Sequence, residues 1–130
     1  TRCFLCAWNR RKTLFSFATE HGFNKVALGH HQDDILTTWL MNITYEGSAT
    51  PAMPPSLRMK HYPITIIRPL CLVDEKSIST LASLLRFQKQ KTPCPYEEAS
   101  RRIDMNGIFH RLESLNPEAR HSMWKAMTGR

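Results

Sequence analysis

The order of apolar and polar positions predicts alternating helices and strands in the first third of the chain. Between residues 7 and 20, apolar side chains recur at three- and four-residue steps, the spacing of an amphipathic helix, and Gly22 is the expected residue at its end. An apolar run at 25–28 predicts a short strand, and a second amphipathic helix is expected to begin at Asp33 or Asp34. This order predicts an α/β fold with a parallel sheet.

Farther along, the pattern predicts a proline-rich loop, two short strands and three helices. The expected segments are a loop at 47–56, strands at 57–59 and 64–67, a helix with Asp74 as its N-cap, a helix that carries 108–115, and a last helix begun by Asn116 and Pro117. The end of the chain is therefore expected to be helical.

The composition fits one folded unit. The chain has 130 residues, of which 42% are hydrophobic and 22% charged, enough for one core. No apolar run approaches the roughly 20 residues of a membrane span, so no membrane partner is expected and the cytoplasm is the expected location. The formal net charge of +7 favours polyanionic partners, nucleic acid first, although a solvated basic surface would explain it equally well.

Four cysteines are too few for a disulfide scaffold, and two of them form a C-x-x-C pair, Cys3 and Cys6. At the start of a helix, with Arg10 at i+4, Cys6 would favour its thiolate, the form that binds metal. Cys94 lies between two prolines that stiffen its loop, which suits a third ligand or simply a tight turn. Three soft ligands indicate zinc or an iron–sulfur cluster, with a redox dithiol or inert cysteines as alternatives. Cys71 is expected in the core.

The sequence GHHQDD at 29–34 lies where a strand is expected to pass into a helix. Ligands of open α/β sheets bind beyond the carboxyl ends of the strands, and Gly29 leaves room for one to approach. Asp33 and Asp34 suit Mg²⁺, which takes one or two carboxylates together with substrate phosphates. Ordinary helix capping by Asp33, with the histidines as polar turn residues, is the alternative.

Several short motifs follow one another in a set order. They are C-x-x-C at 3–6, Arg10 and Arg11, GHHQDD at 29–34, MPP at 53–55, IRPL at 67–70, Glu75 and Lys76, and Pro93 with Cys94. This order resembles the PP-loop (N-type ATP pyrophosphatase) tRNA-modifying enzymes, and within them the TtcA-like tRNA 2-thiocytidine synthetase group. The resemblance implies a partial Rossmann-like PP-loop (adenine nucleotide alpha hydrolase-like) fold with a parallel sheet. It implies the C-terminal part of the PP-loop domain at 1–96 and a helical C-terminal extension at 97–130.

The activity that the resemblance implies is ATP-dependent tRNA 2-thiolation. In such enzymes ATP adenylates the C2 carbonyl oxygen of a tRNA cytidine, and a sulfur nucleophile then displaces AMP to leave 2-thiocytidine. Cys3, Cys6 and Cys94 match three cysteines that hold a [4Fe-4S] cluster, whose fourth iron is left open to carry the sulfur. Implied with it are ATP, Mg²⁺, tRNA and a sulfur donor such as a cysteine desulfurase. A homodimer is one arrangement that the sequence leaves open.

The resemblance also implies roles for single residues. Asp34, with Asp33 beside it, is expected to hold Mg²⁺ and phosphate or to activate the site. Gly29 and His30 are expected in the same nucleotide site. Arg10 is expected to act in catalysis, by holding the anionic intermediate near the cluster.

Basic residues in two regions are expected to contact tRNA. Those expected to do so directly are Arg11, Lys12, Arg101 and Arg102. The tail is basic throughout, with His110, Arg111, Arg120, Lys125 and Arg130, and it offers Trp124 for stacking. A helical lid or a dimer contact is an equally good interpretation of this tail.

Two departures from the family pattern matter. The Ser-Gly-Gly-x-Asp-Ser ATP-binding loop, which precedes the C-x-x-C in the family, is absent. We therefore expect this chain to be the C-terminal part of a longer protein and to bind ATP poorly by itself. Thr37 and Thr38 follow the paired acids where lysidine synthetases tend to have Glu-Thr, which argues against that activity. A lysidine synthetase-like ligase, a zinc-stabilised tRNA-binding module without catalysis and an inactive paralogue remain alternatives.

Overall fold

The computed structural model describes residues 2–89 and 101–129, with side chains from residue 4 onward. Its elements in chain order are α1 (Arg2–Glu20), β1 (Lys25–Ala27), α2 (Gln32–Met41), the π-helical turn η1 (Asn42–Glu46), β2 (Ser56–Arg58), β3 (Thr65–Ile67), α3 (Glu75–Leu84), α4 (Arg101–Leu115) and α5 (Ala119–Thr128). Within the described part, no helix combines the length and hydropathy of a membrane-crossing segment.

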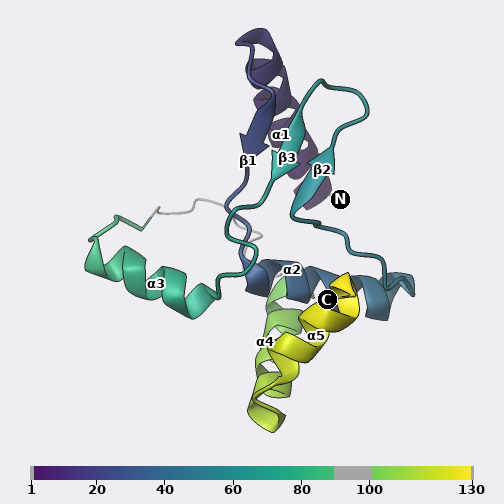
Figure 1. The fold of residues 1–130 in the computed structure, drawn as a ribbon, viewed down its shortest axis with the longest axis vertical. Helices are drawn as coiled ribbons and strands as arrows, with labels where there is room; N and C mark the ends of the chain where they lie inside the picture. The colour runs from purple at the N-terminus through teal and green to yellow at the C-terminus, as the bar shows by residue number, and fades with distance from the viewer. Residues whose placement is uncertain (1, 90–100, 130) are drawn as a thin grey trace.

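A small mixed sheet with strand order β1-β3-β2 organises the first half of the fold (Figure 1). β1 and β3 are parallel, with Val26 opposite Ile66, as the sequence predicts for an α/β fold. β2 is antiparallel to β3, so the sheet is mixed rather than wholly parallel. The physical reason is the short connection between β2 and β3, since a few residues can close a hairpin but cannot make the crossover that parallel pairing needs.

The apolar side chains form two clusters. The first joins α1 to the sheet and consists of Phe15, Ala18, Ile64 and Ile66. The second joins α2 to the two C-terminal helices and consists of Ile35, Leu36, Trp39, Phe109 and Met127. Figure 1 shows α4 and α5 on the side of α2 that faces away from the sheet. The helical tail thus shares its core with α2.

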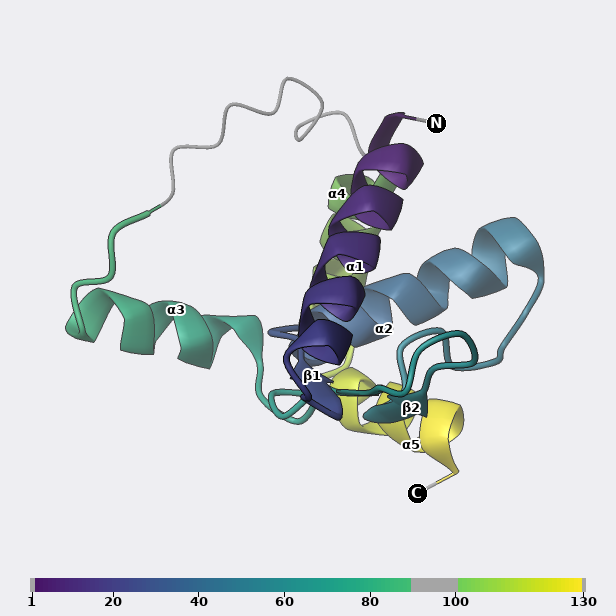
Figure 2. The ribbon, with the colours of Figure 1, turned by 90° about the horizontal axis from the view of Figure 1, so that it is seen from above.

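The third helix stands apart from both clusters. Figures 1 and 2 both show α3 projecting from the rest of the fold, and none of its residues is buried. Its start is nevertheless fixed, because the Asp74 side chain accepts a 2.7 Å hydrogen bond from the Ser77 N–H, as predicted for an N-cap. The amino end of α3 therefore forms part of the site described below.

Several helix boundaries differ from the predicted ones. α1 already includes Cys3 and Cys6, so Cys6 lies in its second turn rather than at its start. Gly22, with φ +76°, follows α1 as expected. α2 begins at Gln32, with His31 rather than an aspartate as its N-cap. α5 begins only at Ala119, because residues 116–118 form a turn before it.

Candidate active site

The carboxyl ends of β1 and β3 lie side by side and carry the candidate site. α1 runs antiparallel to β1, so its amino-terminal half lies on the same side as these strand ends (Figure 1). β1 leads into His30, and β3 leads directly into Arg68. The sequence predicts a ligand site at this edge, and the fold places two polar side chains there from neighbouring parallel strands.

Asp34 closes the N-terminal cap of α2. The Asp34 N–H donates to His31 Nδ1 at 3.3 Å, and the His31 N–H donates to Asp34 Oδ2 at 3.1 Å. This reciprocal pair is a capping box, in which histidine takes the place usually held by Ser or Thr. The Asp34 side chain remains 31% exposed. It lines a cavity of about 220 Å³ together with Thr37, Arg102 and Asn106.

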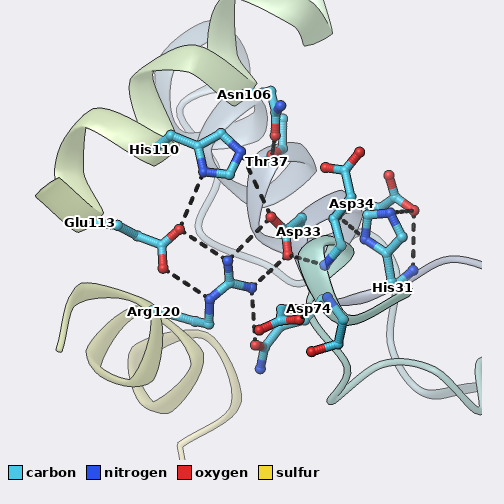
Figure 3. Close-up of polar contacts among 12 residues, drawn as sticks. His31, Asp33, Asp34, Thr37, Asp74, Asn106, His110, Glu113 and Arg120 are labelled. Carbon is cyan, nitrogen blue, oxygen red and sulfur yellow. Dashed lines mark hydrogen bonds and ion pairs between the residues drawn. The ribbon is translucent and has the colours of Figure 1, made fainter. Parts of the chain in front are cut away.

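Asp33 is almost fully buried and bonds to groups from two other helices (Figure 3). Its Oδ1 accepts from the Glu75 N–H at 3.0 Å and from Arg120 Nη1 at 2.6 Å, and its Oδ2 accepts from Arg120 Nη2 at 3.2 Å. Burial works to raise the pKa of Asp33, but these hydrogen bonds outweigh it and hold the pKa below its usual value. The carboxylate is therefore ionised and ties the start of α2 to α3 and α5.

Arg120 is the centre of this network. Its Nε and Nη2 donate to the two carboxylate oxygens of Glu113, each at 3.0 Å, and its guanidinium lies 4.9 Å from the centre of the Phe109 ring. His110 completes the network, with Nε2 3.9 Å from Asp33 Oδ2 and Nδ1 3.4 Å from Glu113 Oε1. Arg120 is therefore neutralised inside the fold, which corrects the expectation that it adds to a basic surface of the tail.

Three side chains of this network form a possible metal-binding group among the described residues. Donor atoms of Asp33, His110 and Glu113 lie within 4.8 Å of one another. They border an open cavity of about 460 Å³ that Asp74, Glu75 and Lys76 also line. Because Arg120 already bonds to both carboxylates, a cation on Asp33 would have to displace this guanidinium. Mg²⁺ binding by Asp33 and Asp34 stays a prediction, and the geometry favours Asp34.

Arg68 is a site residue to which the sequence analysis assigned no role. It is 7% exposed; its Nε donates to His30 Nδ1 at 3.3 Å and its Nη1 donates to the Pro54 carbonyl at 2.6 Å. Burial lowers the pKa of His30, and the guanidiniums of Arg68, Arg102 and Arg11 lower it further, against the influence of Asp34. The sequence signal was an arginine placed directly after a buried strand, within IRPL.

Of the other residues predicted to bind nucleotide or tRNA, some lie near the strand ends and one lies away from them. Arg102 lies near the strand ends, since its Nη1 donates to the Asp34 carbonyl at 3.4 Å. The charges of Arg102 and Arg11 both act to lower the pKa of His30. The space beside Gly29 is open, because a Cβ there would meet nothing within 4 Å. Lys12 instead lines a shallow surface with Glu20 and neighbours on α1.

The structure also places the remaining tail residues that the sequence predicts to contact tRNA. Arg101 is exposed and lies over the Tyr45 ring, 4.5 Å from its centre. Trp124 packs against the second cluster but is only half-buried and lines an open cavity with Pro54 and Met127, so its stacking on a base stays a prediction. Arg111 and Lys125 are exposed, as a basic surface requires.

The cysteines are described only in part. Cys6 is exposed and free on α1, four residues before Arg10 and hence on the same side of the helix. Cys3 belongs to the same helix, but its side chain lies outside the described residues, as does Cys94. Cys71 is half-buried and packs against the second cluster, so it lies at the edge of the core rather than fully inside it as expected. The ligand set Cys3, Cys6 and Cys94 stays a prediction.

Comparison with known proteins gives relatives over nearly the whole chain. The chain is 38% identical over 128 residues to a tRNA-cytidine(32) 2-sulfurtransferase of Legionella pneumophila strain Corby, which covers 98% of this chain and 45% of the relative. It is 36% identical over 129 residues to tRNA-cytidine(32) 2-sulfurtransferase 1 of Francisella tularensis subsp. novicida, covering 98% of this chain and 48% of the relative. No family model matches the chain.

A solved structure agrees with these relatives. The U34-tRNA thiolase NcsA from Methanococcus maripaludis, with its [4Fe-4S] cluster, superposes with a TM-score of 0.81 at 29% identity, covering 98% of this chain and 43% of that one. The chain spans about half the length of the curated relatives it matches. By sequence and by fold, the chain is thus similar to about half the length of tRNA-cytidine(32) 2-sulfurtransferases and of a U34-tRNA thiolase.

Proposed function

We propose that this chain forms part of an ATP-dependent tRNA sulfurtransferase that converts a cytidine to 2-thiocytidine. The observation that carries the proposal is the similarity to tRNA-cytidine(32) 2-sulfurtransferases across 98% of the chain. The likeness to a tRNA thiolase structure supports the same reaction class. A tRNA substrate favours the cytoplasm as the location.

The reaction has two balanced steps. The C2 carbonyl oxygen of the cytidine attacks the α-phosphorus of ATP, which forms an O–P bond and releases pyrophosphate. A sulfur nucleophile at the sulfide level then attacks C2, the C–O bond breaks, and AMP leaves with the oxygen. The first step makes an anionic, phosphate-bearing intermediate, and cationic side chains at the strand ends would stabilise it electrostatically.

The residues at the site have chemistry that suits these steps. The positive charges of Arg11 and Arg102 act electrostatically on His30, and Asp34 presents a partly exposed carboxylate at the start of α2. Arg10 lies on the side of α1 that carries Cys6. We assign Asp34 to Mg²⁺ or to activation of the cytidine, Arg10 to the anionic intermediate, and Arg101 with Arg102 to the tRNA backbone.

A [4Fe-4S] cluster fits the cysteines in the first turns of α1. Cys6 is exposed and unpaired, and Cys3 lies one helical turn before it. Together with Cys94 they would supply three thiolates, the ligands that such clusters take. The group would carry the transferred sulfur when bound. A donor such as a cysteine desulfurase would supply that sulfur.

The test is the reaction itself. The full-length gene product, purified without oxygen, is incubated with ATP, Mg²⁺, sulfide and unmodified tRNA, and the digested nucleosides are analysed by mass spectrometry. The proposal expects 2-thiocytidine, AMP and pyrophosphate in equal amounts. Formation of lysidine in the presence of lysine would instead support the ligase alternative. Tight tRNA binding with stoichiometric zinc and no altered nucleoside would support the non-catalytic module.

A further inference from the structure

Arg68 is a buried cation with no acidic partner among the described residues. Its side chain is 7% exposed, and none of the ion pairs found in the described part of the chain includes it. A buried charge is costly unless it is paired or fully hydrogen-bonded. Arg120 shows what this fold does elsewhere, because that guanidinium has two carboxylates. Arg68 therefore carries a positive charge that no acidic side chain of the described residues balances.

One nitrogen of the Arg68 guanidinium makes no hydrogen bond to the described residues. Nε donates to His30 and Nη1 donates to the Pro54 carbonyl, whereas Nη2 has no partner within residues 2–89 and 101–129. Nη2 is open to solvent, because no buried side-chain nitrogen in the described residues lacks a hydrogen bond. The two bonds that exist fix the plane of the guanidinium. A fixed guanidinium with a free N–H group is well suited to bind an oxyanion.

The same contact determines which nitrogen of His30 carries the proton. Because Arg68 can only donate, His30 Nδ1 must accept, and the neutral imidazole then carries its hydrogen on Nε2. Register brings the two residues together, since Ala27 and Ile67 pair at the ends of parallel β1 and β3. The edge therefore offers two kinds of donor, one cationic and one neutral.

The charges around this pair favour an anion as the ligand. Among the groups that influence His30, three are guanidiniums, of Arg68, Arg102 and Arg11, and one is a carboxylate, of Asp34. We propose that Arg68 Nη2 and His30 Nε2–H bind one phosphoryl group at the carboxyl edge of the sheet, with Arg68 also holding His30 in position. Resting on the proposed function, the group is the α-phosphate of the nucleotide; a tRNA backbone phosphate has the same chemistry.

Nuclear magnetic resonance of the wild-type, full-length gene product tests the arrangement directly. The imidazole of His30 should show an acceptor-type Nδ1 and a protonated Nε2 in the free protein. Titration with AMP, with inorganic phosphate and with tRNA should shift the His30 Nε2–H and Arg68 side-chain signals in at least one case. An Nδ1–H imidazole, or no shift with any of these probes, would overturn the proposal.

Variants separate the two sources of the phosphate. Arg68→Gln should weaken binding of ATP and AMP at least tenfold, Arg68→Lys should restore part of it, and the control Arg58→Gln, exposed on β2, should leave it unchanged. If tRNA affinity falls instead, the ligand is a backbone phosphate. Affinities of a folded Arg68→Gln protein within twofold of the control would overturn the proposal, and for a variant that does not fold the wild-type spectra decide.

Failure of the anion site and failure of the sulfurtransferase proposal give different results. If no 2-thiocytidine forms but the His30 and Arg68 signals respond to AMP or tRNA, the sulfurtransferase proposal fails and the anion site stands. If Arg68→Gln thiolates tRNA with wild-type kcat and KM, the anion site fails alone.

Discussion

The guanidinium of Arg120 bonds to both carboxylate oxygens of Asp33, although 87 residues separate them in the chain. This pair joins the last helix to the first turn of α2, directly beside Asp34. Glu113 and His110 on α4 complete the network. The two C-terminal helices therefore hold the GHHQDD segment in place through Asp33. They have this structural role whether or not they also bind tRNA.

We expect removal of one partner of this pair to destabilise the protein strongly. Asp33→Asn leaves Arg120 beside a neutral amide, and breaking a buried ion pair from one side costs about 3 kcal/mol. Denaturant unfolding followed by circular dichroism measures the loss, with exposed Arg111→Gln as the control at below about 0.5 kcal/mol. Equal unfolding free energies for the two variants would contradict the role of the pair.

The stability provided by Asp33 should depend on pH. The pKa of Asp33 is lowered in the folded state, despite burial, by the bonds from Arg120 and Glu75. A lowered carboxyl pKa contributes stability that is present above the ordinary aspartate pKa of about 4 and is lost as pH falls through the folded value. The gap in unfolding free energy between wild type and Asp33→Asn should be constant above about pH 5 and shrink below about pH 4. A gap that grows in acid would rule this explanation out.

The two helix caps offer a comparison between stability and activity. Asp34→Asn alters the capping box of α2 and Asp74→Asn alters the N-cap of α3, and each should cost at most about 1 kcal/mol. Only Asp34→Asn should also lower thiolation, by about 100-fold or more, because only Asp34 is assigned to the chemistry. Similar kcat values for the two variants would remove Asp34 from the active site.

Basic residues at the carboxyl edge should contribute to tRNA binding in a salt-dependent way. Arg102→Gln should weaken tRNA binding and reduce the slope of log affinity against log salt by about 0.7 to 1, the effect of one lost phosphate contact. Lys60→Gln, an exposed residue in the connection between β2 and β3, is the control and should leave the slope unchanged. Filter binding at several salt concentrations measures both. Indistinguishable slopes would exclude Arg102 from the tRNA surface.

In this protein the sequence predicts helices, strands and helix caps well. It predicts contacts between side chains far apart in the chain poorly. The strand at β1 and the cap at Asp74 follow from local patterns of apolar and capping residues. The partner of Asp33 does not, because no local signal links a residue of α2 to Arg120 on α5. A basic tail is therefore easily taken for a nucleic-acid surface when one of its arginines is already paired inside the fold.

In the candidate site too, locally encoded features are predictable from the sequence and long-range contacts are not. GHHQDD marks the edge of the sheet from its sequence alone, since a polar run after a buried strand is a recognisable signal. The sequence does not single out Arg68, because an arginine directly after a strand is typical of a surface position. Its importance appears only when the parallel register of β1 and β3 places it beside His30.

The most direct test of the sulfurtransferase proposal compares cysteine variants of the full-length gene product. Cys6→Ser and Cys94→Ser are purified without oxygen beside Cys71→Ser, the core control, and each is assayed for iron, sulfide and 2-thiocytidine formation. We predict iron, sulfide and product in the wild type and in Cys71→Ser, and loss of all three in the other two variants. Undiminished 2-thiocytidine formation by Cys94→Ser, or a wild-type protein with zinc and no iron, would contradict the account.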